Sequence, residues 1–169
     1  KMKLFSSTIA LKALMAISGL GLVGFVVFHM AGNLQIFIPD GGESLNKYAA
    51  LLQGLGAAKW VARLGLLSMI FIHIFAAYKL TMRAKRARPH NYKSHKWLSG
   101  TYAVRTMRYG GVIVLLFIIY HIMHFTVGVD DSKMFTDVNH CVAIADGLSC
   151  DVYNNVIKGF RHKGIALFY

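Results

Sequence analysis

The chain has 169 residues, of which 56% are hydrophobic and 15% are charged. Soluble domains carry about 25% charged residues, and the apolar residues here form long blocks, so the composition argues against a soluble domain and for a membrane protein. The formal net charge is +12. Most of the cations lie between two apolar blocks, so we attribute them to membrane topology and expect no nucleic-acid partner.

Three apolar blocks follow one another along the chain, over Ala13–Phe37, Trp60–Thr81 and Tyr109–Val129. Each exceeds the roughly 20 residues that a helix needs to cross the hydrocarbon layer. A fourth apolar run, GIALFY, starts at Gly164. We therefore predict an all-α membrane protein: one transmembrane helical bundle over residues 1–169, with three full spans and the start of a fourth. The first block is too long for a typical signal peptide, so we expect it to be retained.

The loops between these blocks differ in charge. The second loop, Lys79–Arg108, is rich in Lys and Arg, whereas the first, Pro39–Lys59, and the third, Asp130–Val156, contain few cations. The positive-inside rule then places the N-terminus and the second loop in the cytoplasm of a bacterium, with the chain in its inner membrane. Cys141 and Cys150 fall in the outer third loop, where a local disulfide and two free thiols are equally compatible with the sequence.

Each apolar block contains a histidine: His29, His73 and His121, with His124 as a second one in the third block. An ionisable residue inside a membrane is costly and is a functional candidate. A single such histidine is explained by a hydrogen bond to a neighbouring helix, but one on each of three helices favours a cofactor held between them. The blocks contain no Asp, Glu or Cys. This disfavours ion relays, zinc and iron–sulfur clusters, and favours haem with imidazole axial ligands.

The depths of the histidines predict how they pair. At 1.5 Å per residue, His29 and His121 each lie about 13 Å from the outer end of their span, and His73 lies about 21 Å from it. We therefore assign His29 and His121 to an outer haem and His73 to an inner haem. His124, one turn beyond His121, is the alternative ligand, or else a hydrogen-bond partner of a haem propionate or a quinone.

Two further residues are candidates for cofactor binding. Gly21 allows either a flat ring or a neighbouring helix to approach the backbone of the first span. Arg63, near the outer end of the second span, either pairs with a haem propionate or extends its guanidinium to the interface.

Several segments occur in an order that resembles one family: KALMAISGLGLVGFVVFHMAGNLQIF, NKYAALLQ, WVARLGLLSMIFIHIFAAYKL, MRYGGVIVLLFIIYHIMHF and VYNNVIKGF. The chain resembles the b558-type cytochrome b subunit of bacterial succinate dehydrogenase, and is similar to the di-haem subunits of fumarate reductases. The resemblance implies five transmembrane helices, of which the first four each give one histidine to two b haems. His29, His73 and His121 match the first three ligands. We expect the fourth ligand, most of helix four and helix five to lie beyond Tyr169.

The resemblance also implies a function. A flavoprotein subunit would oxidise succinate in the cytoplasm, and an iron–sulfur subunit would pass electrons through the haems to menaquinone or ubiquinone, as in complex II of the tricarboxylic acid cycle. The chain would be the electron-transfer subunit of that enzyme, without catalytic residues of its own. Asn33, Gln35, Glu43 and Tyr48 are the candidates for quinone binding.

Three other functions are alternatives to this one. A fumarate reductase subunit shares the same motifs, and sequence alone does not give the direction of the reaction. A haem b anchor of a hydrogenase or formate dehydrogenase fits the histidine spacing less well. A histidine-lined transporter predicts acidic residues or broken helices in mid-membrane, which the blocks lack.

Overall fold

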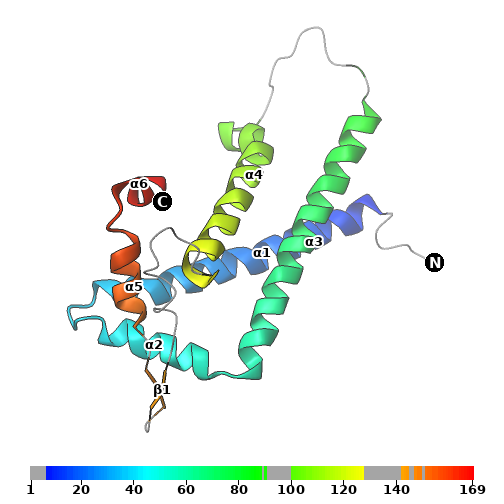
Figure 1. The fold of residues 1–169 in the computed structure, drawn as a ribbon. Helices are drawn as coiled ribbons and strands as arrows, with labels where there is room; N and C mark the ends of the chain where they lie inside the picture. Colours follow the sequence, from blue (N-terminus) through cyan, green and yellow to red (C-terminus); the bar gives the residue numbers. More distant parts are fainter. Residues whose placement is uncertain (1–6, 89, 91–99, 128–141, 145–146, 150) are drawn as a thin grey trace. The chain divides into compact units, whose positions relative to one another are not determined.

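The computed structural model describes residues 7–88, 90, 100–127, 142–144, 147–149 and 151–169. The chain divides into two compact units, Lys1–Asn91 and Tyr92–Tyr169, and each is described by itself. The first unit holds α1 (Thr8–Asn33), the 3-10 turn η1 (Leu34–Phe37), α2 (Glu43–Gly54) and α3 (Ala57–Ala87) (Figure 1). The second holds α4 (Tyr102–Ile122), the π-helical turn η2 (Met123–Val127), β1 (Val142–Ile144), β2 (Gly147–Ser149), α5 (Val152–Gly159) and α6 (Lys163–Phe168).

Helix α1 begins and ends at recognisable signals. Ser7 is its N-cap, and the Ser7 Oγ atom accepts a hydrogen bond from the Ala10 backbone N–H at 3.4 Å. This satisfies one of the amides that have no partner within the helix. After Asn33 the backbone tightens into η1, and Pro39 then prevents any continuation of the helix.

Helices α1 and α3 pack against each other in antiparallel directions. Three contacts give the register. Arg83 Nη1 donates to Thr8 Oγ1 at 2.9 Å, and His73 lies against Ser18. Near the middle of α1, a Cβ on Gly21 would lie 2.7 Å from the sulfur of Met69. As the residue number rises along α1 it falls along α3, so the pair is a helical hairpin.

The first loop of the sequence analysis contains a helix that was not predicted. The Asp40 carboxylate accepts hydrogen bonds from the backbone N–H groups of Gly42, at 2.9 Å, and Ser44, at 2.8 Å. Gly42 has φ +93°, a left-handed conformation that glycine adopts at low cost. This turn starts α2, and Glu43 and Lys47 form an ion pair one turn apart on it.

The second unit is built around α4. Its last turn passes into η2, so the backbone around His124 has π-helical rather than α-helical hydrogen bonds. The Asp151 side chain caps α5 by accepting from the Asn154 backbone N–H at 3.4 Å. A short antiparallel hairpin pairs Val142 with Ser149 and Ile144 with Gly147. The hairpin is a local addition to a helical fold.

The predicted fold class is confirmed. Three helical segments are long and apolar enough to cross a membrane: Thr8–Phe37, Ala57–Ala87 and Tyr102–Thr126. They contain the three predicted blocks, apart from residues 127–129 of the third, of which 128 and 129 lie outside the described residues. Most of their apolar side chains are exposed within the chain, including Phe28, Phe71 and Leu116. Exposed apolar surface of this extent is compatible with lipid and not with water, so the chain is a multi-pass membrane protein.

The basic connecting segment Lys79–Arg108 is partly helical. Helix α3 continues to Ala87, and α4 starts at Tyr102. Lys and Arg are good helix formers, so a helix that leaves the membrane at a basic stretch has no reason to stop there. The predicted fourth apolar run does coincide with a helix, α6. Cys141 and Cys150, for which the sequence left a disulfide and two free thiols equally open, lie outside the described residues.

Candidate functional site

His73 is held against α1 through one ring nitrogen. Its Nδ1 atom lies 3.1 Å from the backbone oxygen of Met15 and 3.2 Å from Ser18 Oγ. Ser18 is buried, and its hydroxyl also lies 2.7 Å from the Leu14 carbonyl, to which it donates. A carbonyl oxygen only accepts hydrogen bonds, so Nδ1 of His73 carries the proton and Nε2 keeps its lone pair. This nitrogen is the one that a neutral histidine offers to a metal.

Glycines on α1 let α3 approach closely. A Cβ on Gly19 would lie 3.2 Å from Cε1 of His73, which is tight, so the imidazole rests almost on the backbone of α1. Met69 of α3 occupies the space beside Gly21, so at this glycine it is the neighbouring helix that approaches the backbone. Nothing lies within 4 Å of a Cβ on Gly24. The role of Gly21 toward a cofactor stays a prediction.

His29 lies on an exposed face of α1. Its ring stacks on Phe25, with centroids 5.3 Å apart. Asn33 Nδ2 donates to the His29 backbone oxygen at 2.7 Å and lies 3.5 Å from the His29 Nε2 atom. Ser18, the neighbour of His73, precedes His29 by eleven residues. That spacing corresponds to about 16 Å along the helix axis, so His29 and His73 belong to different levels of the hairpin.

His121 and His124 both face the hydroxyl of Tyr169. The Tyr169 oxygen lies 3.0 Å from Nδ1 of His124 and 3.4 Å from Nδ1 of His121. Rings surround this contact: Phe117 stacks on His121, and Tyr120 stacks on His124. Tyr169 was not among the predicted site residues, because it is 45 residues from His124 and no local pattern links the two.

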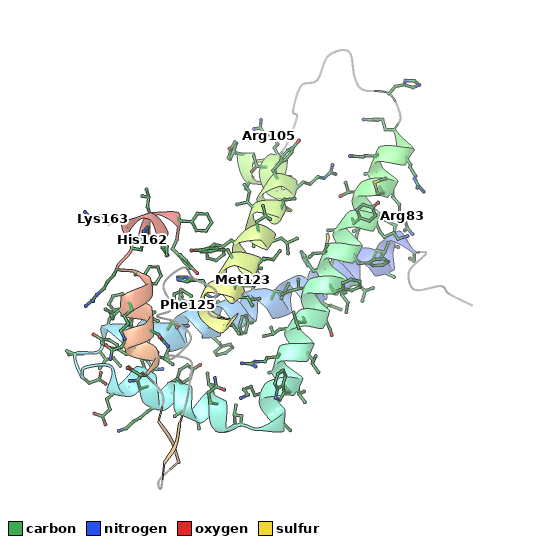
Figure 2. All side chains as sticks on the ribbon, in the orientation of Figure 1. Arg83, Arg105, Met123, Phe125, His162 and Lys163 are labelled. Atoms are coloured by element: carbon green, nitrogen blue, oxygen red, sulfur yellow. The ribbon has the colours of Figure 1, made fainter. Side chains whose placement is uncertain are left out.

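Burial separates the two histidines. The His124 side chain is 2% exposed, and its Nε2 atom is buried. His121 is only partly buried. A planar cofactor tens of atoms in size cannot reach a nitrogen enclosed in the packed part of its own unit without opening that unit. Of the two, His121 is therefore the one that is accessible to an external ligand. Met123 and Phe125, which precede and follow His124 on η2, mark the position of this turn in Figure 2.

Arg63 and the predicted quinone-binding residues have other contacts as well. The Arg63 guanidinium lies over the ring of Trp60, 5.1 Å from its centroid. The Tyr48 ring packs on Gly32, where a Cβ would come within 2.6 Å of Tyr48 Cε1. This contact accounts for the glycine of the HMAGN segment. Glu43 is paired with Lys47.

The histidines are distributed over both units. His29 and His73 are in the first and His121 and His124 in the second, so the predicted pairing of His29 with His121 stays a prediction. Within the described parts of the chain, no three His, Cys, Asp or Glu side chains form a common metal-binding group. A haem iron with two axial imidazoles requires only two such side chains, from facing helices.

The fold and the histidines define a multi-pass α-helical membrane protein with candidate metal ligands on three spans. Comparison with protein-family models, with curated proteins and with solved structures finds no match to this chain.

Proposed function

We propose that this chain is the membrane-anchor cytochrome b subunit of a succinate:quinone oxidoreductase, holding b haems through His29, His73 and His121. Its partners in this proposal are a flavoprotein and an iron–sulfur subunit on the cytoplasmic side of a bacterial inner membrane, and menaquinone or ubiquinone. When bound, haem b supplies reversible one-electron chemistry. The protein would contribute the imidazole nitrogens that hold the haem, their orientation and an apolar surrounding.

The observation that carries the proposal is the environment of His73. A donated hydrogen bond from Nδ1 to a backbone carbonyl fixes the ring and its tautomer, and it raises the basicity of Nε2. The Met15 carbonyl and Ser18 supply this support inside an apolar helix pair that contains no carboxylate. These residues fit an axial haem ligand. Within the described residues of the first unit, the polar contacts of His73 are with Met15 and Ser18, which do not titrate, whereas a proton relay would require a second titratable group there.

Tyr169 acts as a positioning residue in this proposal. Its hydroxyl has one proton, so it donates to only one of the two Nδ1 atoms and accepts from the other. If His121 donates from Nδ1, the phenol donates to His124, whose own proton then resides on Nε2. In this arrangement His121 offers an unprotonated Nε2 and His124 does not. The greater accessibility of His121 supports this assignment over the reverse.

The separation of His29 from His73 supports two haems rather than one. Two histidines that would hold the same haem must lie at one level of the bundle. Side chains about 16 Å apart along a helix axis do not meet that condition. Each of these histidines therefore requires a partner at its own level, and His121 is the candidate for the level of His29.

The test is a reduced-minus-oxidised absorbance spectrum of the complex purified with all its subunits from native membranes. We expect the bands of a b-type cytochrome, reduction by succinate, and co-purification of a flavin-containing subunit. A colourless complex would overturn the haem assignment. A b-type spectrum that succinate does not reduce, in a complex with a hydrogenase or formate dehydrogenase subunit, would overturn the succinate assignment and leave the haem ligands in place.

A further inference from the structure

The end of α3 carries a group of cations on one face. Lys79, Arg83 and Arg86 are spaced at i, i+4 and i+7, which brings them to the same side of a helix. With Tyr78 and Met82 they line a hollow of about 290 Å³. Figure 2 shows Arg83 on this part of α3. We call these five residues the basic hollow.

The depth of the basic hollow matches that of lipid phosphates. From Trp60 to Lys79 the helix rises about 30 Å, the thickness of the hydrocarbon core. Arg83 and Arg86 then lie about 6 and 10 Å further along the axis. The headgroup layer is about 5–8 Å deep on each side of the core, so these cations begin where the acyl chains end and extend across that layer. Tyr78 stands at the boundary, the usual place for an interfacial aromatic side chain.

Within the described residues of the first unit, the only acidic side chains are those of Asp40 and Glu43. The sequence has no Asp or Glu between residues 44 and 129, and none before Asp40. Asp40 and Glu43 follow the opposite end of α1, far from the end of α3. Arg83 is oriented by its hydrogen bond to Thr8, in the first turn of α1. The N-terminus of that helix adds further positive potential.

We propose that the basic hollow binds the phosphate of an anionic phospholipid. Arg86 and Arg83 offer planar guanidinium groups that suit phosphate oxygens, and Lys79 adds a point charge at the acyl boundary. Tyr78 and Met82 give apolar contact for the glycerol and the first methylenes of the chains. A lipid is favoured over a soluble anion because the hollow combines cations with apolar walls at headgroup depth. The proposal does not depend on the haem assignment.

The test compares two double variants of the intact complex. Lys79→Gln/Arg86→Gln removes two cations of the hollow and leaves Arg83 bonded to Thr8. Lys85→Gln/Arg88→Gln removes two cations from the same end of α3 that do not line the hollow. Native mass spectrometry, after reconstitution with phosphatidylglycerol and phosphatidylcholine, measures the lipid retained. At about fivefold per cation, we expect the first variant to retain phosphatidylglycerol about twenty-five-fold less and the second to match the parent within about twofold.

Several results would overturn the proposal. Equal loss in both variants would mean a diffuse positive surface instead of a site. Retained lipid together with loss of a soluble subunit from Lys79→Gln/Arg86→Gln would make the hollow a protein-docking site. Displacement of phosphatidylglycerol from the parent complex by millimolar inorganic phosphate would make it a site for a free anion. If the first variant fails to fold, lipid retention by the parent complex gives the test. Equal retention of phosphatidylcholine and phosphatidylglycerol by the parent would exclude an anionic-lipid site.

Discussion

The Nδ1 atom of His73 lies 3.2 Å from the hydroxyl of Ser18, and this contact sets the level of His73 against α1. Counting residues from the outer end of each predicted span places His73 about 8 Å deeper than His29. The register of α1 and α3 gives about 16 Å, because Ser18 precedes His29 by eleven residues. The larger separation strengthens the inference that the two histidines serve different irons.

Replacing Tyr169 tests whether its hydroxyl selects His121. We expect Tyr169→Phe to lower haem affinity at the His121 site by about tenfold, because removal of a hydrogen-bond partner of a metal-binding histidine has effects of that order. Haem per subunit, measured after graded detergent washing, gives the readout. Tyr109→Phe, at an exposed tyrosine of α4, the helix that carries His121, is the matched control and should behave as the parent.

The choice between His121 and His124 is tested by two single variants. We expect His124→Gln to retain the b-type spectrum, since the buried His124 ring is not accessible to a cofactor. We expect His121→Gln to lose one haem. Loss of a haem in His124→Gln and its retention in His121→Gln would make His124 the ligand. The hydroxyl of Tyr169 would then donate to His121 and accept from His124.

Gly32 is expected to be required for packing rather than for flexibility. In Gly32→Ala the new Cβ would lie 2.6 Å from Tyr48 Cε1, so the ring or the helix must move. Overpacking of this kind costs about 1–3 kcal/mol. Thermal unfolding of the purified complex should show a lowered midpoint.

Gly24→Ala is the control for this effect, since nothing lies within 4 Å of its Cβ and alanine is the better helix former. Gly32→Ala/Tyr48→Leu should recover part of the lost stability. Equal midpoints for Gly32→Ala and Gly24→Ala would contradict the packing role.

The start of α2 should lose stability in acid. The hydrogen bonds from Ser44 are the main cause that holds the pKa of Asp40 below its ordinary value of 3.8. A carboxyl whose pKa is lowered by folding contributes its stability above the unfolded pKa and loses it as the pH falls through the folded one. The turn should therefore be unchanged from neutral pH to about 4 and loosen below 3.8.

Hydrogen exchange at the amides of Gly42 and Ser44, corrected for the intrinsic rate, measures this loosening. Asp40→Asn should remove the acid step, and Glu43→Gln should leave it in place. An acid step that persists in Asp40→Asn would point to another group.

The spans were predictable from sequence because hydrophobic length is a local property. Helix α2 was also within reach, since Asp40, the two following glycines and Ser44 form a recognisable helix start that was not used. The contacts of His73 with Met15 and Ser18 were not predictable. They depend on the rotation of α1 against α3, which the spacing of apolar residues on two nearly uniform apolar helices does not determine. The Tyr169 contact has the same origin, packing between segments far apart in the sequence.

The central claim, that histidines on separate spans hold two haems at two levels, is tested most directly by potentiometric titration of His29→Leu, His73→Leu and His121→Leu in the intact complex. The account predicts that the parent titrates with two b-type components. His29→Leu and His121→Leu should lose the same component and keep the other, and His73→Leu should lose the one that those two retain. Loss of one and the same component in all three variants, or an unchanged spectrum in all three, would contradict it.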